Sequence, residues 1–267
     1  MNARLRLQSP LMELRSHLIP GVLALLMLLL APGCSAPGHI ERQPLELDGP
    51  VAVRINTFAG NVEVRGTAPD TNGKSFVQVT RHSHISQDDE IDIDEFITWS
   101  TTIDRDDRGP VLVVDVTPRD EHVADWWRGH VIVEVPMIDG ITVNTTHGDI
   151  SVDEVTGPVE LITTDGDVEL LSDQPLRGPL KILTSEGDVN VRLAPKSEGM
   201  LDLFAKNGRV GLHIKAGQMH IEPGTRDDAV QGSLNGGEMP FVIRTTHGVI
   251  RFTVKHNPKP HGIFHWD

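Results

Sequence analysis

The sequence predicts an all-β fold, a β-solenoid-like stack of repeats of about 20 residues with an antiparallel N-terminal portion. The main observation is a twelve-residue pattern that occurs six times, with its glycine at Gly60, Gly148, Gly166, Gly187, Gly208 and Gly248. Apolar residues stand seven and five places before each glycine and two and four places after it, and helical signals are nearly absent. Because one unit is too small to bury its own apolar face, the units must stack on one another.

The spacing of the copies favours a solenoid. The first apolar positions fall at Ile141, Val159, Leu180, Leu201 and Phe241, so the successive spacings are 18, 21, 21 and 40 residues. The last spacing indicates two periods with one degraded copy between them. In a solenoid each glycine marks a corner, and equivalent residues of successive turns lie about 4.8 Å apart. Thr or Ala stands three places before every glycine, which fits an inner corner where space narrows. The alternative is a β-sandwich meander with a hairpin at each glycine.

The segment between the first and second copies predicts the antiparallel portion. Runs of alternating or clustered β-branched residues extend from Ser75 to Arg81, Glu95 to Ile103, Val111 to Thr117 and His130 to Pro136. The open ends of a stack must be covered. We therefore expect residues 75 to 136 and the tail after His256 to protect the strand edges.

The amino terminus predicts export and lipidation. Three arginines precede an uncharged stretch over residues 18–31, which has the length of a signal-peptide apolar region and is too short to span a bilayer. The stretch leads into Leu-Ala-Pro-Gly-Cys-Ser, which resembles the bacterial lipobox, and Cys34 is the single cysteine of the chain. The prediction is a lipid on Cys34 that anchors the protein to a membrane. An ordinary signal peptide with an incidental cysteine is the alternative.

Four segments are predicted from these boundaries. They are a signal peptide over residues 1–33 that starts at Met1 or Met12, Cys34 with a tether over residues 34–47, a β domain over residues 48–255, and a C-terminal tail over residues 256–267. Pro37, Gly38 and Pro44 discourage regular structure in the tether.

The charge of the chain limits its ligands. The net charge is −14, and removal of residues 1–33 takes away three Arg and one Glu, which leaves −16. Such an acidic surface argues against nucleic acid and against anionic lipid headgroups as direct ligands. It is compatible with cations or neutral glycans. If Cys34 carries the lipid, no disulfide forms, and stability depends on packing and backbone hydrogen bonds.

Four motifs carry a family resemblance. They are INTFAGNVEVRG at 55–66, VIVEVPMIDGITVNTTHGDISV at 131–152, and the tandem units TTDGDVEL and TSEGDVNV. In their number and order they resemble the bacterial "putative adhesin" family, a domain of unknown function found in envelope proteins. The resemblance covers roughly residues 48–255. It implies an all-β, solenoid-like domain on the cell envelope, and it implies no catalytic residues because the family has none assigned.

Three aspartates are the candidate metal ligands. Asp149, Asp167 and Asp188 each follow the glycine of their copy, so a solenoid would stack them in one column. A calcium ion would neutralise such a column, since hard cations take oxygen ligands from several carboxylates. Calcium is the one cofactor that the sequence suggests. In the alternative interpretation each aspartate accepts hydrogen bonds from the amides of its own turn.

Other chemistry-bearing residues give weaker signals. His147 and Asp165 precede their glycines and would lie side by side on a polar ridge. His256, His261 and His265 in the tail lack the spacing of a preformed metal site. Of the adjacent Trp126 and Trp127, which point to opposite sides of an extended chain, one is expected in the core. The sequence contains neither a Gly-x-Ser-x-Gly elbow nor a phosphate loop.

Together these observations predict a non-enzymatic, lipid-anchored protein of the bacterial cell envelope, facing the periplasm or the cell exterior. Its repetitive β surface would serve adhesion or binding, with an envelope protein or a glycan as partner and no role for nucleic acid. The first alternative is an envelope accessory protein that acts by protein–protein contact at a strand edge. The second is a glycan-processing β-helix enzyme, which would need a pair of carboxylates beside the scissile bond.

Overall fold

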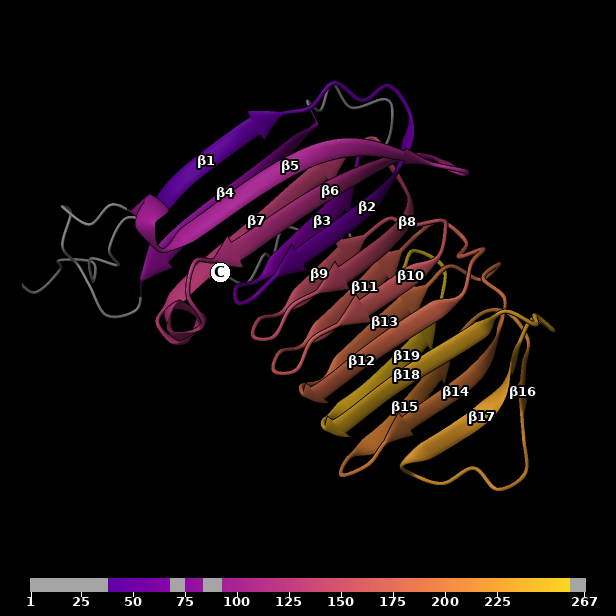
Figure 1. Ribbon diagram of the computed structural model, residues 1–267. Coiled ribbons are helices and arrows are strands. Elements are labelled where there is room, and N and C mark those ends of the chain that lie inside the picture. Colours follow the sequence, from indigo (N-terminus) through magenta and orange to yellow (C-terminus); the bar gives the residue numbers. More distant parts are fainter. Residues whose placement is uncertain (1–37, 68–74, 84–92, 260–267) are drawn as a thin grey trace, which may run out of the picture. The chain divides into compact units, whose positions relative to one another are not determined.

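The computed structural model describes residues 38–67, 75–83 and 93–259, and these residues are almost entirely β (Figure 1). They belong to a compact unit that begins at Gly38. The predicted signal peptide, Cys34 and the last part of the tail lie outside the described residues. Within the described part of the chain, no helix is long and apolar enough to cross a membrane.

The strands form two mixed sheets that pack face to face (Figure 1). Sheet A has the order β1 (His39–Pro44), β4 (Phe76–Ser83), β7 (Trp127–Val135), β3 (Val62–Gly66), β9 (Ile150–Asp153), β11 (Val168–Ser172), β13 (Val189–Leu193), β19 (Val249–Val254) and β15 (Arg209–Ile214). Sheet B has the order β16 (Met219–Ile221), β17 (Ala229–Leu234), β14 (Gly199–Ala205), β18 (Pro240–His247), β12 (Leu180–Glu186), β10 (Val159–Ile162), β8 (Met137–Asn144), β2 (Pro50–Thr57), β6 (Gly109–Pro118) and β5 (Ile97–Asp106).

Each predicted copy forms one turn of a solenoid. Its first half is a strand of sheet B, its glycine lies at a corner, and its second half is a strand of sheet A. Strands of successive turns pair in parallel and in register, so that Val159 lies opposite Leu180 in sheet B and Val168 lies opposite Val189 in sheet A. The apolar positions of the pattern point between the sheets and form one core. The predicted solenoid-like stack is confirmed, and the sandwich meander is not observed.

The corner requires glycine for two reasons. Gly166 has a φ of 156°, in the region that residues with a side chain rarely adopt. A Cβ atom on Gly166 would also lie 2.1 Å from the carbonyl oxygen of Gly148 in the adjacent turn. Gly148, Gly187 and Gly248 meet the same restriction, with contacts of 2.0–2.2 Å. The glycines therefore let the backbones of successive turns stack directly.

The threonine three places before the glycine has a partner in the adjacent turn. Thr163, Thr184 and Thr245 are buried, and their hydroxyls donate to the carbonyl oxygens of Gly148, Gly166 and Gly187 at 3.2, 3.2 and 3.0 Å. A buried hydroxyl is costly without such an acceptor. The position thus needs a small side chain that can donate a hydrogen bond across turns.

The last copy does not occupy the last place in the stack. β18 lies between β12 and β14, and β19 lies between β13 and β15. The sequence predicted a degraded copy within the 40-residue spacing before Phe241, and this prediction is wrong. Instead β16 and β17 form an antiparallel extension beyond β14 and cover that edge of sheet B.

The antiparallel portion hides a further turn of the stack. β6 is parallel to β2, and β7 is parallel to β3. Gly129 lies at the corner of this turn, where its N–H donates to the carbonyl of Ala59 in the adjacent turn. An insertion with the short helix η3 (Glu121–Asp125) separates Val116 from this glycine, so the twelve-residue pattern is interrupted. The antiparallel strands β5 and β4 then cover the end of the stack, as predicted for residues 75 to 136, and β1, which was not predicted, pairs with β4 at the outer edge.

A buried arginine ties this end together. Arg81 in β4 is 1% exposed and pairs with Glu41 of β1 and with Asp94 of the short helix η2 (Ile93–Glu95). Its guanidinium also donates to the carbonyl of Ile97 at 2.7 Å, and Trp99 Nε1 donates to Glu41 at 2.9 Å. The hydrogen bond and charge of Arg81 hold the pKa of the Asp94 carboxyl below its ordinary value.

β1 corrects the expectation that the tether lacks regular structure. His39–Pro44 lies within the predicted tether and nevertheless forms a strand, because it pairs along its length with β4. Pro44 is tolerated because β1 is the edge strand of sheet A. The expected lack of regular structure up to Pro44 is therefore wrong.

Candidate functional site

The three predicted metal ligands lie in one column on the corner. Asp149 Oδ1 accepts the backbone N–H of Asp167 at 2.8 Å, Asp167 Oδ1 accepts that of Asp188 at 2.7 Å, and Asp188 Oδ1 accepts that of Val249 at 2.8 Å. Asn61 begins the column by accepting the N–H of Asp149 at 3.1 Å. Each side chain thus accepts the amide of the adjacent turn, whereas the alternative interpretation assigned it to amides of its own turn.

The column leaves outward oxygens for other partners. Asp188 Oδ2 pairs with Arg251 at 2.9 Å, while Asp149 and Asp167 are exposed. In the part of the chain that the structure describes, no three His, Cys, Asp or Glu side chains form a group that would hold a metal ion. Calcium binding by Asp149, Asp167 and Asp188 stays a prediction.

Replacing Asp167 separates the two roles of the column. Asp167→Ala removes the acceptor of the Asp188 N–H and should lower the free energy of unfolding by about 1 kcal/mol. Asp167→Asn keeps an amide oxygen as acceptor and should change it by less than about 0.5 kcal/mol. Thermal unfolding with and without calcium completes the test. A calcium-dependent rise in Tm that Asp167→Asn abolishes would establish a cation site, and the absence of a rise would leave the column as amide acceptors alone.

The polar ridge forms as predicted beside this column. His147 Nδ1 lies 3.7 Å from Asp165 Oδ2, and both side chains are largely exposed. Farther along the ridge, Asn207 Nδ2 lies 3.0 Å from His247 Nε2. These contacts are pairwise and solvated, so they give the ridge the character of an outer surface.

The tryptophan pair divides as expected. Trp127 is 8% exposed and stacks on Phe96 with the ring centroids 4.8 Å apart, while Trp126 is 52% exposed. Of the tail histidines, His256 is exposed, and His261 and His265 lie outside the described residues.

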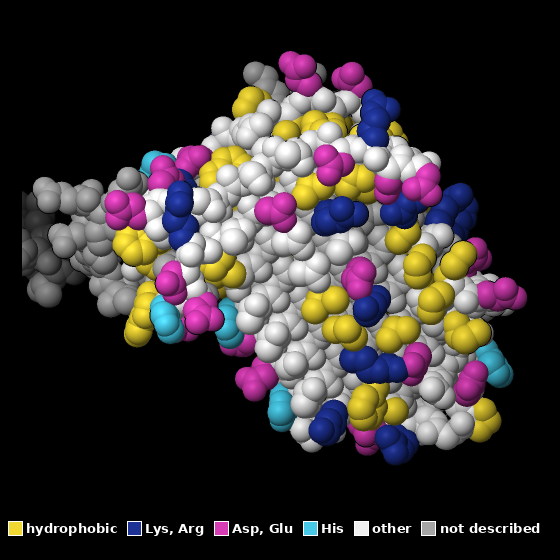
Figure 2. Space-filling view, in the orientation of Figure 1, with side chains coloured by type: hydrophobic (Ala, Val, Ile, Leu, Met, Phe, Trp, Pro, Cys, Tyr) yellow, Lys and Arg dark blue, Asp and Glu magenta, His cyan; other side chains and the backbone are white. Residues whose placement is uncertain are grey.

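The two outer faces of the stack differ in chemistry. On sheet A the half-buried outward positions of β9, β11 and β13 include the polar residues Ser151, Glu169 and Asn190, and Ile132 on β7 is an apolar exception in the same row. On sheet B the corresponding surface has an apolar centre, formed by Ile162, Leu183, Val242 and Phe204, and the ion pair of Arg244 with Asp202 lies among these residues on β18 and β14. Figure 2 shows hydrophobic side chains gathered among Lys and Arg, in the region where Figure 1 places β10, β12 and β18. A solvated sheet face normally carries polar side chains, so the apolar centre marks sheet B as the candidate binding face.

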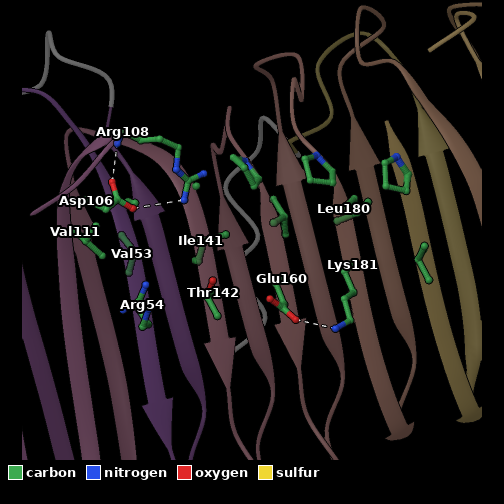
Figure 3. A pocket seen from close by; sticks show the side chains of 17 residues that line it. Val53, Arg54, Asp106, Arg108, Val111, Ile141, Thr142, Glu160, Leu180 and Lys181 are labelled. Carbon is green, nitrogen blue, oxygen red and sulfur yellow. Dashed lines mark hydrogen bonds and ion pairs between the residues drawn. The ribbon is translucent and has the colours of Figure 1, made fainter. Parts of the chain in front are cut away.

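A groove of about 500 Å³ crosses this face at the starts of the strands (Figure 3). Its apolar lining includes Val111, Pro158, Pro179, Pro240 and Val242, and its polar lining is formed by Arg54, Thr142, Glu160, Lys181, Asp106 and Arg108. The outward residues Arg54, Thr142, Glu160, Lys181 and Val242 are register neighbours on β2, β8, β10, β12 and β18. The groove therefore runs across the strands, along the axis of the stack.

The charges of the groove are nearly all paired. Lys181 Nζ lies 2.8 Å from Glu160 Oε1, and Arg108 lies 3.7 Å from Asp106 (Figure 3). Arg54 is exposed and makes no ion pair or hydrogen bond with the described residues. It is consequently the unpaired cation of a largely apolar groove in an acidic protein.

A second cavity of about 340 Å³ lies between the turns and includes Glu154, Asp173 and Lys259 in its lining. Lys259 Nζ lies 3.1 Å from Glu154 and 3.5 Å from Asp153. Burial raises the pKa of the Asp153 carboxyl above its ordinary value of 3.8, against the opposing attraction of Lys259. The ammonium group thus lies against Glu154, which lines the cavity, and against the adjacent Asp153.

The raised pKa predicts a pH-dependent effect of Asp153. Because its folded pKa exceeds its unfolded value, its contribution to stability is fully present below pH 3.8 and is lost as the pH rises through the raised pKa. The stability of Asp153→Asn relative to the wild type should therefore increase as the pH rises from about 3.5 to about 7, the range in which carboxyl groups ordinarily titrate. Urea unfolding at a series of pH values measures the difference. A difference that falls with pH would mean that pairing with Lys259 outweighs burial.

The groove was missed at the sequence level although the sequence holds two signals of it. Proline stands eight places before the glycine in three copies, at Pro158, Pro179 and Pro240. Ile162 and Leu183 are apolar at positions that a solvated sheet face would make polar. Their alignment into one surface became visible only with the parallel register of the turns.

Comparisons with known proteins agree with this fold. Residues 129–253 match the family model described as Toastrack DUF4097. A putative cell adhesion protein from Clostridium sporogenes ATCC 15579 has a similar crystal structure, with 12% identity, coverage of 82% of this chain and 100% of its own, and a TM-score of 0.54. A putative adhesin from Bacteroides fragilis NCTC 9343 shares 11% identity over 81% of this chain and 97% of its own, with a TM-score of 0.31.

Among curated proteins no sequence matches the chain. At these identities the Clostridium structure bears on the fold, and that fold is the two-sheet stack described above. The resemblance to a putative adhesin-like family of unknown function is therefore confirmed, with residues 129–253 matching Toastrack.

Proposed function

We propose that this chain is a lipid-anchored protein of the bacterial envelope that binds a partner through the outer face of sheet B, without enzymatic turnover. The single observation that carries the binding role is the apolar centre of that face, formed by Ile162, Leu183, Val242 and Phe204. The similarity in fold to a protein described as a putative cell adhesion protein supports the same role.

The lipobox-like motif supports the anchor. Cys34 is the single cysteine, and it follows an apolar stretch of signal-peptide length. Expression of the full chain and of Cys34→Ser with labelled palmitate tests this part. Label and membrane association should both be lost in the variant. A labelled Cys34→Ser protein, or an unlabelled wild type, would contradict the anchor.

Two matched substitutions test the binding face. Leu183→Asp places a charge in the apolar centre of sheet B, and Ser151→Asp places one at a half-buried outward position of sheet A. Both positions are partly solvated, so each change should cost less than about 1 kcal/mol of stability, which Tm values verify.

Binding is measured with the mature chain on beads, against purified envelope glycans and against intact bacterial cells. Leu183→Asp should reduce the bound fraction at least about ten-fold, equivalent to roughly 1.4 kcal/mol, while Ser151→Asp should leave it unchanged. If the sheet A substitution reduces binding equally, or if the sheet B substitution does not, sheet B is not the binding face.

One observation favours contact through a strand edge as a second candidate. β15 is the last strand of sheet A, and Val210, Leu212 and Ile214 on it are only partly buried. An edge strand with apolar side chains can pair with a strand of another protein. Leu212→Lys should abolish binding in the same bead assay if this edge is the contact, and should be silent if sheet B is.

The enzyme alternative receives little support from the carboxylates. A glycosidase needs two carboxyl groups flanking a bond, with room for the sugar between them. Asp153 and Glu154 are adjacent in sequence, and Glu154 lines a cavity, but Lys259 Nζ lies within 3.5 Å of both carboxylates. The two carboxyl groups are therefore paired with a lysine instead of flanking an open space.

A further inference from the structure

We propose that the groove on sheet B binds a single-chain anionic amphiphile, with its head group on Arg54 and its acyl chain along the prolines. The inference rests on the proposed function, because it assigns a ligand to the same face. The groove is the place on this face where an unpaired cation and a continuous apolar lining occur together.

The apolar part has the form of a line. Pro158, Pro179 and Pro240 stand just before the register neighbours Val159, Leu180 and Phe241, so they follow one another from strand to strand. Val242 extends the apolar lining on β18. From β2 to β18 the groove crosses four strand spacings, or about 19 Å. This length suits an extended acyl chain, and burying its methylenes contributes about 0.8 kcal/mol for each one removed from water.

The polar part is specific for one negative charge. Lys181 and Arg108 already pair with Glu160 and Asp106, while Arg54 has no partner among the described residues. A guanidinium binds a carboxylate or a phosphate through paired N–H donors. Arg54 lies on β2, toward the end of the groove opposite to β18. The ligand would therefore lie with its anion over β2 and its chain over β10, β12 and β18.

Two other ligand classes fit the groove less well. Its lining contains no aromatic ring on which a sugar could stack. An extended peptide would bring backbone N–H and C=O groups that need partners, and the groove crosses the middle of a sheet whose backbone groups are paired within the ladder. An acyl chain brings no such groups.

The acidic surface had argued against anionic lipid ligands. That argument concerns the net charge of the whole mature chain, −16, whose effect salt screens beyond about 8–10 Å. In the groove the carboxylates Asp106 and Glu160 are paired, so Arg54 sets the local charge.

Calorimetric titration of the mature chain with laurate, below its critical micelle concentration, tests the proposal. Wild type should bind with a Kd on the order of micromolar. Arg54→Gln should weaken binding at least ten-fold, and Val242→Glu, which puts a carboxylate in the apolar end, should abolish it. Arg209→Gln removes the same charge from an exposed strand position outside the groove and should bind as wild type does. Tm values confirm that each variant is folded.

The head group distinguishes the source of the ligand. Binding of both laurate and lysophosphatidylglycerol would indicate recognition of the anion alone, and binding of the lysolipid only would indicate a phosphate head group. Lysophosphatidylcholine and dodecanol should bind at least ten-fold more weakly. If neither anionic probe binds, or if Arg54→Gln binds as tightly as Arg209→Gln, the proposal is overturned. The Leu183→Asp bead assay is read separately, so the binding face can survive the loss of this ligand.

Discussion

Replacement of Gly166 by alanine should lower the free energy of unfolding by about 3–5 kcal/mol, which is a large part of the stability of an ordinary domain. The new Cβ would lie 2.1 Å from the carbonyl oxygen of Gly148, and this oxygen belongs to a backbone that cannot move without disturbing the next turn. The positive φ of Gly166 adds strain of about 1–3 kcal/mol. Urea unfolding followed by far-UV circular dichroism measures the loss.

Gly109→Ala is a matched control for this prediction. Gly109 has a φ of 141°, close to that of Gly166, but no atom lies within 4 Å of where its Cβ would be. The control therefore carries the backbone strain without the clash and should cost about 1–2 kcal/mol. Equal losses in the two variants would show that the stack yields around the methyl group, and that glycine serves only the backbone angle.

Replacement of Arg81 by methionine should lower the free energy of unfolding by about 2–3 kcal/mol. Methionine retains much of the apolar stem but removes the guanidinium that donates to Glu41, Asp94 and the carbonyl of Ile97. The cost lies at the lower end of the range for buried ion pairs, because Glu41 and Asp94 are themselves 36% and 70% exposed and can be solvated again.

The loss should be concentrated at the end of the stack. β1 is exposed along most of its length and pairs only with β4, so its amides should exchange with deuterium faster in Arg81→Met than in the wild type. Arg65→Met is the surface counterpart, since Arg65 is 42% exposed and pairs with Glu63 and Glu134. It should cost less than about 1 kcal/mol. Similar exchange in both variants would contradict the assigned role of Arg81.

The repeat made the architecture predictable because one set of residue types serves every turn. Gly166 and Val168 meet their equivalents in the adjacent turns, and Thr163 donates to the glycine of the adjacent turn, so the same constraint applies to each copy. The burial of Val159 and Leu161 between the sheets follows from alternation alone. For these positions local pattern and global fold agree.

The order of the turns was not predictable on the same grounds. The copies around Leu201 and Phe241 both satisfy the pattern, and any turn with a parallel edge offers the same hydrogen bonds to the next. Which copy lies next to β12 depends on the path of residues 215–239, where β17 pairs with β14 and β16 pairs with β17 instead of continuing the stack. The corner at Gly129 was not predicted either, because the insertion with η3 separates β6 from Gly129 and so interrupts the twelve-residue pattern.

Of the two candidate sites, the aspartate column was predictable from the repeat and the groove with Arg54 was not. The column of Asp149, Asp167 and Asp188 follows from the repeat, and the structure adds which amides it accepts. Arg54 belongs to no pattern. Its importance depends on the absence of a partner among its neighbours across four strands, which is a property of the assembled sheet.

The position of the last copy has a consequence for the order of folding during synthesis. Among the described strands β15 pairs only with β19, whose residues are made some 40 positions later, so this strand is synthesised before its partner exists. The N-terminal turns can fold in the order in which they are synthesised, whereas β14, β15 and the final copy must assemble together. A premature stop before Pro240 would remove more than the final copy, because β14 and β15 would then have no parallel strand with which to pair. Growth of this stack by duplication of its final unit is likewise blocked, since that unit is enclosed on both sides.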